Sequence, residues 1–557
     1  MTAHASGALA PLPWSLGPYR TAVERRLALW KEEGLGPRYW RKDPTVWPAA
    51  PPSDVRDRMG WLSLPETPPD RLADLERFAD EVRAEGTRHV VVLGMGGSSL
   101  APDVFARTFE VRSDYPELFV LDSTHPSEVT ALTLRIDLAR TLFIVSSKSG
   151  TTTEPNAFFH YFFHQVQRLA ESPGRQFVAV TDPGTPLERL AHDREFRRAF
   201  LVPPDVGGRY SALTEFGLVP AALHGVPVRA LLDAARGQAD AQGPAVPVVQ
   251  NPGFVLGAAL GELGLAGRDK VTFLADPPFD SFPDWAEQLI AESTGKSGRG
   301  IVPVAHEPSR PPNSYGTDRV FVTLERPGTA DGAESRGKEL ARAGHPVLRF
   351  ALENRASLGA EFLRWETGVA MAGAVIGINP YDQPDVELAK QLARDAMADP
   401  KGPGSPPEDR TVRADAPDSL RAALERWAGT LAAGDYVAVQ AYLPPSITVR
   451  EAVETLQRSL LERYGRATTL GFGPRFLHST GQLHKGGPPG GHFLQLTNEI
   501  MNDVAVPEES YSFGRLIAAQ ALGDLLALVQ RGRSVLRVEL GRDLLGGLAA
   551  LARSIHG

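Results

Sequence analysis

A run of serines and threonines surrounds one lysine and one glycine at positions 146–153. The run follows a short apolar segment, 143–145, and precedes a helical pattern that begins near Glu154. A strand that enters such a turn and then a helix brings backbone amides, hydroxyl groups and the positive end of the helix dipole to one point. Four hydroxyl side chains are difficult to explain as a purely structural connection, so residues 147–152 are predicted to bind a phosphate group.

A second turn of the same form comes earlier, at residues 94–99, directly after the apolar segment 90–93. Its glycines would let the backbone approach an anion closely, although a lone glycine-rich turn is as often a tight structural connection. A dinucleotide-binding motif is poorly matched because its third glycine is missing. A nucleotide P-loop is also poorly matched, because no Gly-Lys-Ser/Thr follows Gly94 at the required spacing.

Both turns lie in a region where short apolar runs alternate with helical patterns. Strands are expected at residues 89–93, 118–121, 142–145, 177–180 and 200–202, and helices at 71–85, 126–140, 154–171 and 185–193. This alternation predicts right-handed βαβ units and a doubly wound parallel sheet. Ligands of such sheets bind at the carboxyl ends of the strands, which is where both turns lie.

The same alternation continues to the end of the chain. A second unit is expected from strands 271–274, 320–324 and 347–350 with helices 284–293, 358–376 and 384–397, and a third from strands 436–442, 493–497 and 535–540 with helices 448–464 and 512–530. Residues 399–418 are rich in proline, glycine and charge, which is typical of a linker. We therefore expect an α/β protein divided into an N-terminal arm (1–70), two doubly wound domains (71–245 and 246–400), a linker (401–418) and a C-terminal α/β lobe (419–557).

Composition excludes several classes of function. The 557 residues carry a net charge of −8, which favours neither nucleic acid nor an anionic membrane as a partner. The absence of cysteine excludes disulfides and thiolate metal sites. The first 20 residues show no secretory signal, and no apolar run approaches the roughly 20 residues of a membrane span, so a cytoplasmic location is expected.

Taken together, the two turns resemble the phosphate-binding loops of the sugar isomerase (SIS) domain and, more specifically, of the glucose-6-phosphate isomerase family. The resemblance implies that the first loop contributes Gly97 and Ser98 to the sugar phosphate site. It implies that the second loop contributes Ser147, Lys148, Ser149, Thr151 and Thr152, with Lys148 acting through its backbone. The two central domains are then expected to be SIS-like.

Two further segments extend the resemblance to the reacting end of the sugar. Segment 206–211 resembles the family's Gly-Gly-Arg stretch, which implies that Arg209 lies against the enediolate; a permanently charged guanidinium suits such an oxyanion. Segment 288–296 resembles the stretch with the catalytic base, which implies that Glu292 abstracts the proton. The alternatives are a surface arginine and a solvated glutamate at a helix end.

Segment 378–390 resembles the family's late signature. It implies that Gln383 binds the phosphate and that Lys390 contacts the ring oxygen or O1 of the sugar. The two residues are seven positions apart, which is two helical turns, so they are expected to face the same side. Without the resemblance, Lys390 would be interpreted as a solvated charge on a helix.

The histidine that opens the sugar ring has a different place in this chain. In typical family members it lies between the base and the late signature, where this chain has only His306 and His345, neither in the expected setting. A cluster at 478–488 instead resembles the isomerase half of bacterial transaldolase/glucose-6-phosphate isomerase fusion proteins. His484 is the first candidate for ring opening and His478 the second; the alternative is a structural loop whose histidines cap backbone groups.

The resemblance implies an enzyme that interconverts glucose 6-phosphate and fructose 6-phosphate through a cis-enediol, as a homodimer without a metal or organic cofactor. No carboxylate or cysteine joins the late histidines at metal-ligand spacing. Isomerisation of mannose 6-phosphate, alone or in addition, remains an alternative, because one epimeric hydroxyl cannot be inferred from sequence. A non-catalytic sugar-phosphate sensor is the third possibility, although no DNA-binding module is visible.

Overall fold

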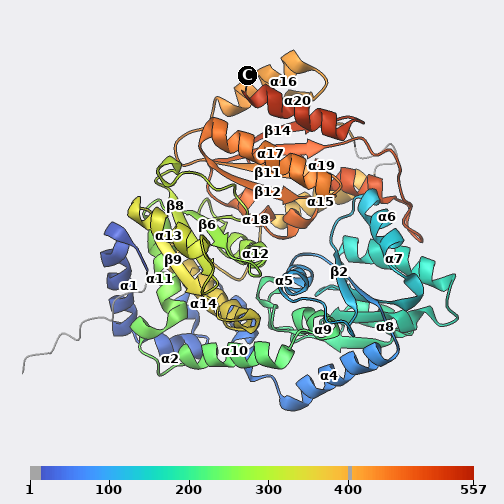
Figure 1. The fold of residues 1–557 in the computed structure, drawn as a ribbon, viewed down its shortest axis with the longest axis horizontal. Helices are drawn as coiled ribbons and strands as arrows, with labels where there is room; N and C mark the ends of the chain where they lie inside the picture. Colours follow the sequence, from blue (N-terminus) through green and yellow to red (C-terminus); the bar gives the residue numbers. More distant parts are fainter. Residues whose placement is uncertain (1–13, 399–403, 557) are drawn as a thin grey trace, which may run out of the picture.

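The computed structural model describes residues 14–398 and 404–556, which form three parallel β-sheets covered by helices (Figure 1). Parts of the predicted arm and linker, residues 1–13 and 399–403, lie outside the described residues. Every pairing of strands within the sheets is parallel, so the predicted α/β class is confirmed.

The first sheet carries the two glycine- and serine-rich turns and has the strand order β2-β1-β3-β4-β5. Its central strands are buried along nearly their whole length, which explains their uninterrupted apolar sequence. The strands are β1 (His89–Gly94), β2 (Glu117–Leu121), β3 (Thr141–Ser146), β4 (Phe177–Thr181) and β5 (Arg198–Leu201). The helices are α4 (Pro69–Ala84), α5 (Leu100–Thr108), α6 (Pro126–Arg135), α7 (Thr153–Gln167), α8 (Pro186–Asp193) and α9 (Glu215–Leu223).

The second sheet has the order β7-β6-β8-β9. Its strands are β6 (Lys270–Ala275), β7 (Val302–Val304), β8 (Arg319–Glu325) and β9 (Val347–Ala351). The helices of this region are α10 (Val228–Ala241), α11 (Pro252–Leu265), α12 (Phe282–Thr294), α13 (Ala333–Arg342) and α14 (Leu358–Ile376).

The third sheet has the order β10-β14-β13-β11-β12. Its strands are β10 (Thr411–Arg413), β11 (Tyr436–Tyr442), β12 (Ala467–Phe472), β13 (Gly491–Thr497) and β14 (Ser534–Glu539). Its helices are α16 (Pro417–Ala428), α17 (Ile447–Tyr464), α18 (Gly481–Gly486), α19 (Phe513–Gln530) and α20 (Leu544–His556), and α15 (Val386–Ala398) packs along α19. Strand β10 lies within the segment expected to be a linker.

The three sheets share one winding pattern. In each, one strand lies next to the strand that follows it on one side and to the third strand on the other, as β1, β6 and β11 do. Strand β10 is an addition at the far edge of the third sheet. Each sheet therefore has a point where the direction of winding reverses, and the carboxyl ends beside that point are the usual place for a ligand.

The N-terminal arm consists mainly of α1 (Arg20–Glu32), α2 (Leu35–Trp40) and α3 (Pro52–Arg58). Its tryptophans Trp47 and Trp61 are fully buried. The indole of Trp47 donates to the carbonyl of Ala370 in α14 at 2.8 Å, and Trp61 stacks on Tyr210 with ring centroids 5.2 Å apart. The arm therefore supports the segment that carries Arg209.

One continuous hydrophobic core joins the arm to the first and second sheets, whereas the third sheet has a core of its own. Helices α12 and α18 pack together near the centre of the molecule, between the sheets (Figure 1). Among the described residues, α19 alone is long and apolar enough to cross a membrane, and most of it is buried inside the protein. Burial of that kind is ordinary for a core helix.

Candidate active site

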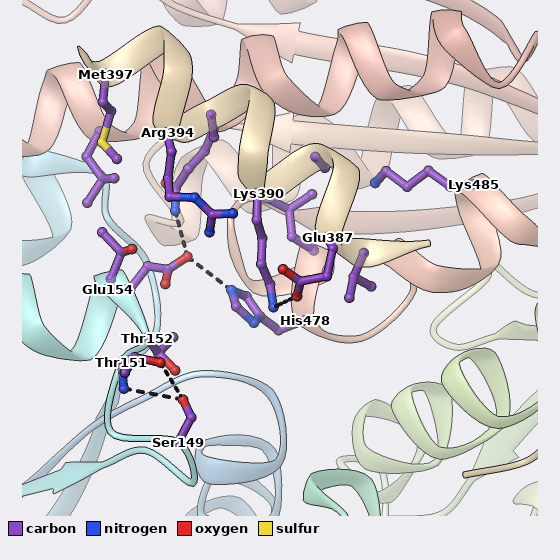
Figure 2. A pocket seen from close by; sticks show the side chains of 17 residues that line it. Ser149, Thr151, Thr152, Glu154, Glu387, Lys390, Arg394, Met397, His478 and Lys485 are labelled. Carbon is purple, nitrogen blue, oxygen red and sulfur yellow. Dashed lines mark hydrogen bonds and ion pairs between the residues drawn. The ribbon is translucent and has the colours of Figure 1, made fainter. Parts of the chain in front are cut away.

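The serine- and threonine-rich loop links β3 to α7 and holds its own shape through hydroxyl contacts. Ser147 Oγ lies 3.0 Å from Thr152 Oγ1 and accepts a hydrogen bond from the backbone N–H of Gly150 at 3.2 Å. Gly150 has φ +67°, which a side chain would strain. Ser149 Oγ and Thr151 Oγ1 lie 2.9 Å apart and point into a pocket (Figure 2).

Lys148 directs its ammonium away from this pocket. Its Nζ pairs with Asp182 and donates to the carbonyl of Pro204 at 3.1 Å. A ligand in the loop would therefore meet only the backbone of Lys148.

The first loop is pressed against the segment that carries Arg209. A Cβ at Gly97 would collide with the carbonyl of Gly208, and one at Gly96 would meet the carbonyl of His478. Ser98 is buried at the carboxyl end of β1. The glycines therefore allow the first loop, which includes Ser98, to pack against the segments that carry Arg209 and His478.

The buried Arg209 pairs with the partly buried Glu292 near the end of α12. The Nη1 atom of Arg209 lies 3.5 Å from Glu292 Oε2, while Nη2 donates to the carbonyl of Asp382 at 3.0 Å and to Gln383 Oε1 at 2.7 Å. Arg209 is only 3% exposed, and its Nη1 has no hydrogen-bond partner. A buried guanidinium donor is thus available beside the predicted base.

Burial raises the pKa of Glu292, although Arg209 and a hydrogen bond with Gln288 act in the opposite direction. A carboxylate with a raised pKa is a stronger base than an exposed one, which suits proton abstraction next to a carbonyl.

Sequence reasoning missed Lys296, which follows α12 and holds Asp382, in the segment that Arg209 also contacts. Its Nζ donates to the carbonyl of Asp382 at 2.5 Å and to Asp382 Oδ1 at 2.8 Å. Burial, with the neighbouring charge of Arg209, lowers the pKa of Lys296 to about 8. Its place after the glutamate in segment 288–296 was the only signal, and a lysine at a helix end is usually solvated.

Gln383 and Lys390 do not share a helix face. Pro384 follows Gln383 and α15 begins only at Val386, so the expected two-turn relation fails. Gln383 instead accepts a hydrogen bond from Arg209, whereas Lys390 lines the pocket with Ser149 and Thr151. Lys390 Nζ pairs with Glu387 Oε1 at 2.9 Å (Figure 2).

His478 faces the phosphate loop from the third sheet. Its Nε2 lies 3.0 Å from Glu154 Oε1, and its carbonyl accepts from Gln288 Nε2 at 2.8 Å. Figure 2 shows the imidazole between Glu154 and Lys390. His478 therefore connects the phosphate loop with the helix that carries Glu292.

Sequence reasoning also missed Glu154, the residue that fixes His478. Glu154 is buried and accepts a second hydrogen bond from Gln520 Nε2 at 2.7 Å. Burial favours its neutral form, but His478 and Lys390 outweigh that effect and lower its pKa. An acidic residue in the first turn of a helix is common for the helix dipole alone, so the sequence offered no specific signal.

His484, the first candidate from sequence, lies outside this pocket. It is buried in α18 between the rings of Phe476 and Phe493, at centroid distances of 5.8 and 5.0 Å. Its Nδ1 lies 3.2 Å from Gln440 Nε2, and burial holds its pKa well below the usual value. The structure thus brings His478, and not His484, to the phosphate loop and Lys390.

The pocket has a volume of about 370 Å³ and receives side chains from α7, α15, α18 and α19. Its hydroxyl groups, His478 and Lys390 can bind an anion at one end and exchange protons at the other. Among residues 14–398 and 404–556, no group of three or more His, Asp or Glu is arranged to hold a metal ion.

Comparisons with known proteins agree on one family. The family model described as phosphoglucose isomerase matches residues 75–298. The glucose-6-phosphate isomerase of Rubrobacter xylanophilus is 30% identical over 398 residues, which is 62% of this chain and 90% of that protein. The enzyme of the same name from Heliobacterium modesticaldum is 31% identical over 385 residues, 60% of this chain and 85% of that protein.

Solved structures support the fold. A hypothetical protein of Thermus thermophilus is similar with a TM-score of 0.59 and 25% identity, covering 68% of this chain and 97% of its own. A glucose-6-phosphate isomerase of Chlamydia trachomatis has a TM-score of 0.50 and 23% identity, covering 58% and 72%. Since this chain covers most of the length of relatives at 30% and 31% identity, it belongs to the glucose-6-phosphate isomerase family.

Proposed function

We propose that the protein interconverts glucose 6-phosphate and fructose 6-phosphate, with the phosphate held in the loop between β3 and α7 and the proton moved by Glu292. Membership of the family and the names of its relatives support the reaction. The observation that carries the mechanism is the ion pair between Arg209 and Glu292, in which Nη1 of the guanidinium lies 3.5 Å from the carboxylate without a hydrogen-bond partner.

The phosphate end of the substrate is assigned to hydroxyls and backbone amides. Ser149, Thr151 and Thr152 line the pocket at the start of α7, where the helix dipole favours an anion. Ser147 braces the loop, and Ser98, in the turn that follows β1, is assigned to the same phosphate by the resemblance to the family. Gln383 is assigned an indirect role, since its amide oxygen already accepts from Arg209.

Ring opening is assigned to His478, with Lys390 close to it in the same pocket. Opening a cyclic sugar requires a proton to leave the anomeric hydroxyl and another to reach the ring oxygen. Histidine is the side chain that does both near neutral pH. Glu154 holds the imidazole of His478 through Nε2, whereas His484 is buried between aromatic rings, where burial lowers its pKa.

Isomerisation is assigned to Glu292 and Arg209. The carboxylate takes the proton from C2 of the open-chain aldose and returns it to C1, through a cis-enediol. Arg209 Nη1 stabilises the negative charge that develops on the oxygens during that transfer. Lys296 adds little net positive charge to the site, because its ammonium is paired with the carboxylate of Asp382.

Three finer features belong to the same proposal. The histidine cluster at 478–488 supports grouping this chain with the isomerase half of transaldolase/glucose-6-phosphate isomerase fusion proteins. A cytoplasmic enzyme fits a glycolytic reaction. A homodimer is expected from the family, although the chain already carries His478 next to its own phosphate loop.

A coupled assay with fructose 6-phosphate tests the assignment, using Glu292→Gln and the matched variant Glu287→Gln from the same helix. Glu292→Gln is expected to lose activity at least ~1,000-fold (about 4 kcal/mol), whereas Glu287→Gln stays within a few-fold of wild type. Wild-type activity in Glu292→Gln would refute the role of the base. Conversion of mannose 6-phosphate at a similar rate would indicate dual specificity, and no turnover of either sugar would indicate a sensor.

A further inference from the structure

A second cavity, of about 270 Å³, lies at the carboxyl edge of the third sheet. Its wall contains the last residue of each of four strands: Arg413 of β10, Tyr442 of β11, Thr497 of β13 and Glu539 of β14. The pairing of the strands places Tyr442 beside Thr497, Thr497 beside Glu539 and Glu539 beside Arg413. These four residues therefore form one row across the end of the sheet.

The cavity lies at the point where the winding of the third sheet reverses. From β11 the chain goes to β12 on one side and to β13 and β14 on the other, so the reversal falls between Tyr442 and Thr497. In the first sheet the equivalent reversal falls between β1 and β3, and the phosphate loop follows β3. The topology alone thus makes this cavity a candidate ligand site.

Arg537 is the independent sign of a ligand. It is 8% exposed, lies two residues before Glu539 on the same face of β14, and lines the cavity. Its Nε donates to Thr497 Oγ1 at 3.4 Å, but its Nη1 has no hydrogen-bond partner. Within the described part of the chain, no carboxylate lies at ion-pair distance from it. A buried guanidinium without an ion-pair partner costs free energy, which an anion in the cavity would recover through its charge.

The remaining polar groups define the chemistry of that anion. Arg413 lies exposed at the rim, where Asp415 holds it through two contacts of 2.9 and 2.7 Å; an anion at the rim would share its guanidinium with that exposed carboxylate. Glu499 is already held by Arg542 through two contacts of 3.0 and 3.1 Å, so its charge is largely compensated. Glu539 forms no ion pair among the described residues and is free to accept hydrogen bonds from hydroxyl groups. An anionic group next to hydroxyls satisfies both sets of partners.

We propose that this cavity binds a small phosphorylated polyol, with the phosphate on Arg537 and Arg413 and the hydroxyls on Glu539 and Thr497. The site is distinct from the catalytic pocket, because α19 lies between the two. Gln520 of α19 faces the catalytic pocket, whereas Ile517 and Ala521 face this cavity. The proposal does not depend on the assignment of the isomerase reaction.

Calorimetric titration of the full-length protein with glycerol 3-phosphate tests the proposal. The wild type is expected to bind two equivalents per chain, one in each cavity, and Arg537→Met to bind one while its kcat and KM for fructose 6-phosphate remain unchanged. The exposed Arg426→Gln, in the same lobe, serves as the matched control and is expected to bind two. Two equivalents in Arg537→Met, or a single equivalent in the wild type that persists in Arg537→Met, would overturn the proposal.

Arg413→Gln keeps the test decisive if Arg537→Met does not fold, because Arg413 is at the rim and supports no core packing. Loss of one charged hydrogen-bond donor is expected to weaken the second equivalent about 10- to 100-fold. Soaking crystals with tungstate, a heavy tetrahedral oxyanion, is expected to give an anomalous peak beside Arg537. A peak at the catalytic pocket alone would count against the second site.

Discussion

Replacing Arg209 by lysine keeps a positive charge in the active site but removes the two-pronged guanidinium. In the wild type, one prong donates to the carbonyl of Asp382 at 3.0 Å and to Gln383 Oε1 at 2.7 Å. The other prong, Nη1, lies 3.5 Å from Glu292 Oε2 without a hydrogen-bond partner. A single ammonium cannot hold the segment with Gln383 and also reach the oxygens of an enediolate.

The expected cost follows from the loss of one preorganised donor to a developing oxyanion. Such losses reduce kcat by about 100- to 1,000-fold, or about 3–4 kcal/mol. The phosphate loop is not altered, so KM for fructose 6-phosphate is expected to change by less than about threefold. Arg209→Lys should therefore act on kcat almost alone.

Arg209→Met is expected to change how kcat depends on pH, in a direction that follows from the pKa of Glu292. Burial raises the pKa of Glu292, and Arg209 is the main group that lowers it. Without the guanidinium this pKa rises further. Because the base must be ionised, the acidic limb of the kcat profile moves to higher pH in Arg209→Met, and less in Arg209→Lys.

The measurement is a coupled assay of glucose 6-phosphate formation across the pH range, for both variants and for Arg229→Lys, an exposed control arginine that pairs with Glu76. The reasoning is refuted if Arg209→Lys keeps kcat within about threefold of wild type, since an oxyanion donor is worth far more. An acidic limb that stays in place in Arg209→Met would refute the link between Arg209 and the base.

Three further predictions concern side chains around the site. Glu154→Gln should lower kcat about 10- to 100-fold in the same assay, because the charged hydrogen bond to His478 is lost; unchanged turnover would contradict the role of Glu154. His484→Ala should lower the free energy of unfolding by about 2–4 kcal/mol, because packing and the contact with Gln440 are lost, while kcat stays within about threefold of wild type. If the variant were stable but inactive, ring opening would have to be assigned to His484. Burial, then Asp284, raises the pKa of Glu287 to about 7 from an ordinary value of 4.5, so wild-type stability should fall by about 3 kcal/mol as pH rises from about 4.5 to about 7. Thermal unfolding measured across this pH range should show no such loss of stability in Glu287→Gln. If the stability of the variant and of the wild type fell equally with pH, the raised pKa of Glu287 would be contradicted.

The phosphate loop could be predicted from sequence because its signal is local. Hydroxyls, a glycine and a strand-to-helix transition all fall within residues 146–153, and Ser149 and Thr151 line a pocket; that the loop binds a phosphate stays a prediction. Strands β1 and β3 were equally clear, since buried parallel strands are continuous apolar runs. The short strand β10 was not found, because three residues in a Pro- and Gly-rich segment carry no periodicity.

The histidine and its partner could not be predicted in this way. His478 and His484 are six residues apart in one glycine-rich stretch, and only the turn between them decides which ring faces the pocket. Glu154 and Gln520 come from α7 and α19, which are 366 positions apart at these residues. No local pattern connects such a pair, because the contact exists only once the first and third sheets have packed together.

That packing also explains why a histidine missing from the usual stretch need not be missing from the site. The phosphate loop follows β3 of the first sheet, Glu292 lies on the helix that follows β6 of the second, and His478 follows β12 of the third. The serine- and threonine-rich loop and His478 thus come from the carboxyl ends of strands, where backbone donors and helix starts gather, whereas Glu292 comes from the last turn of α12. Since Gln288 bridges from α12 to the carbonyl of His478, the end of β12 reaches the base within one chain. Ring opening requires a histidine at the pocket, and the end of β12 can supply one there although it lies far along the sequence from the usual stretch.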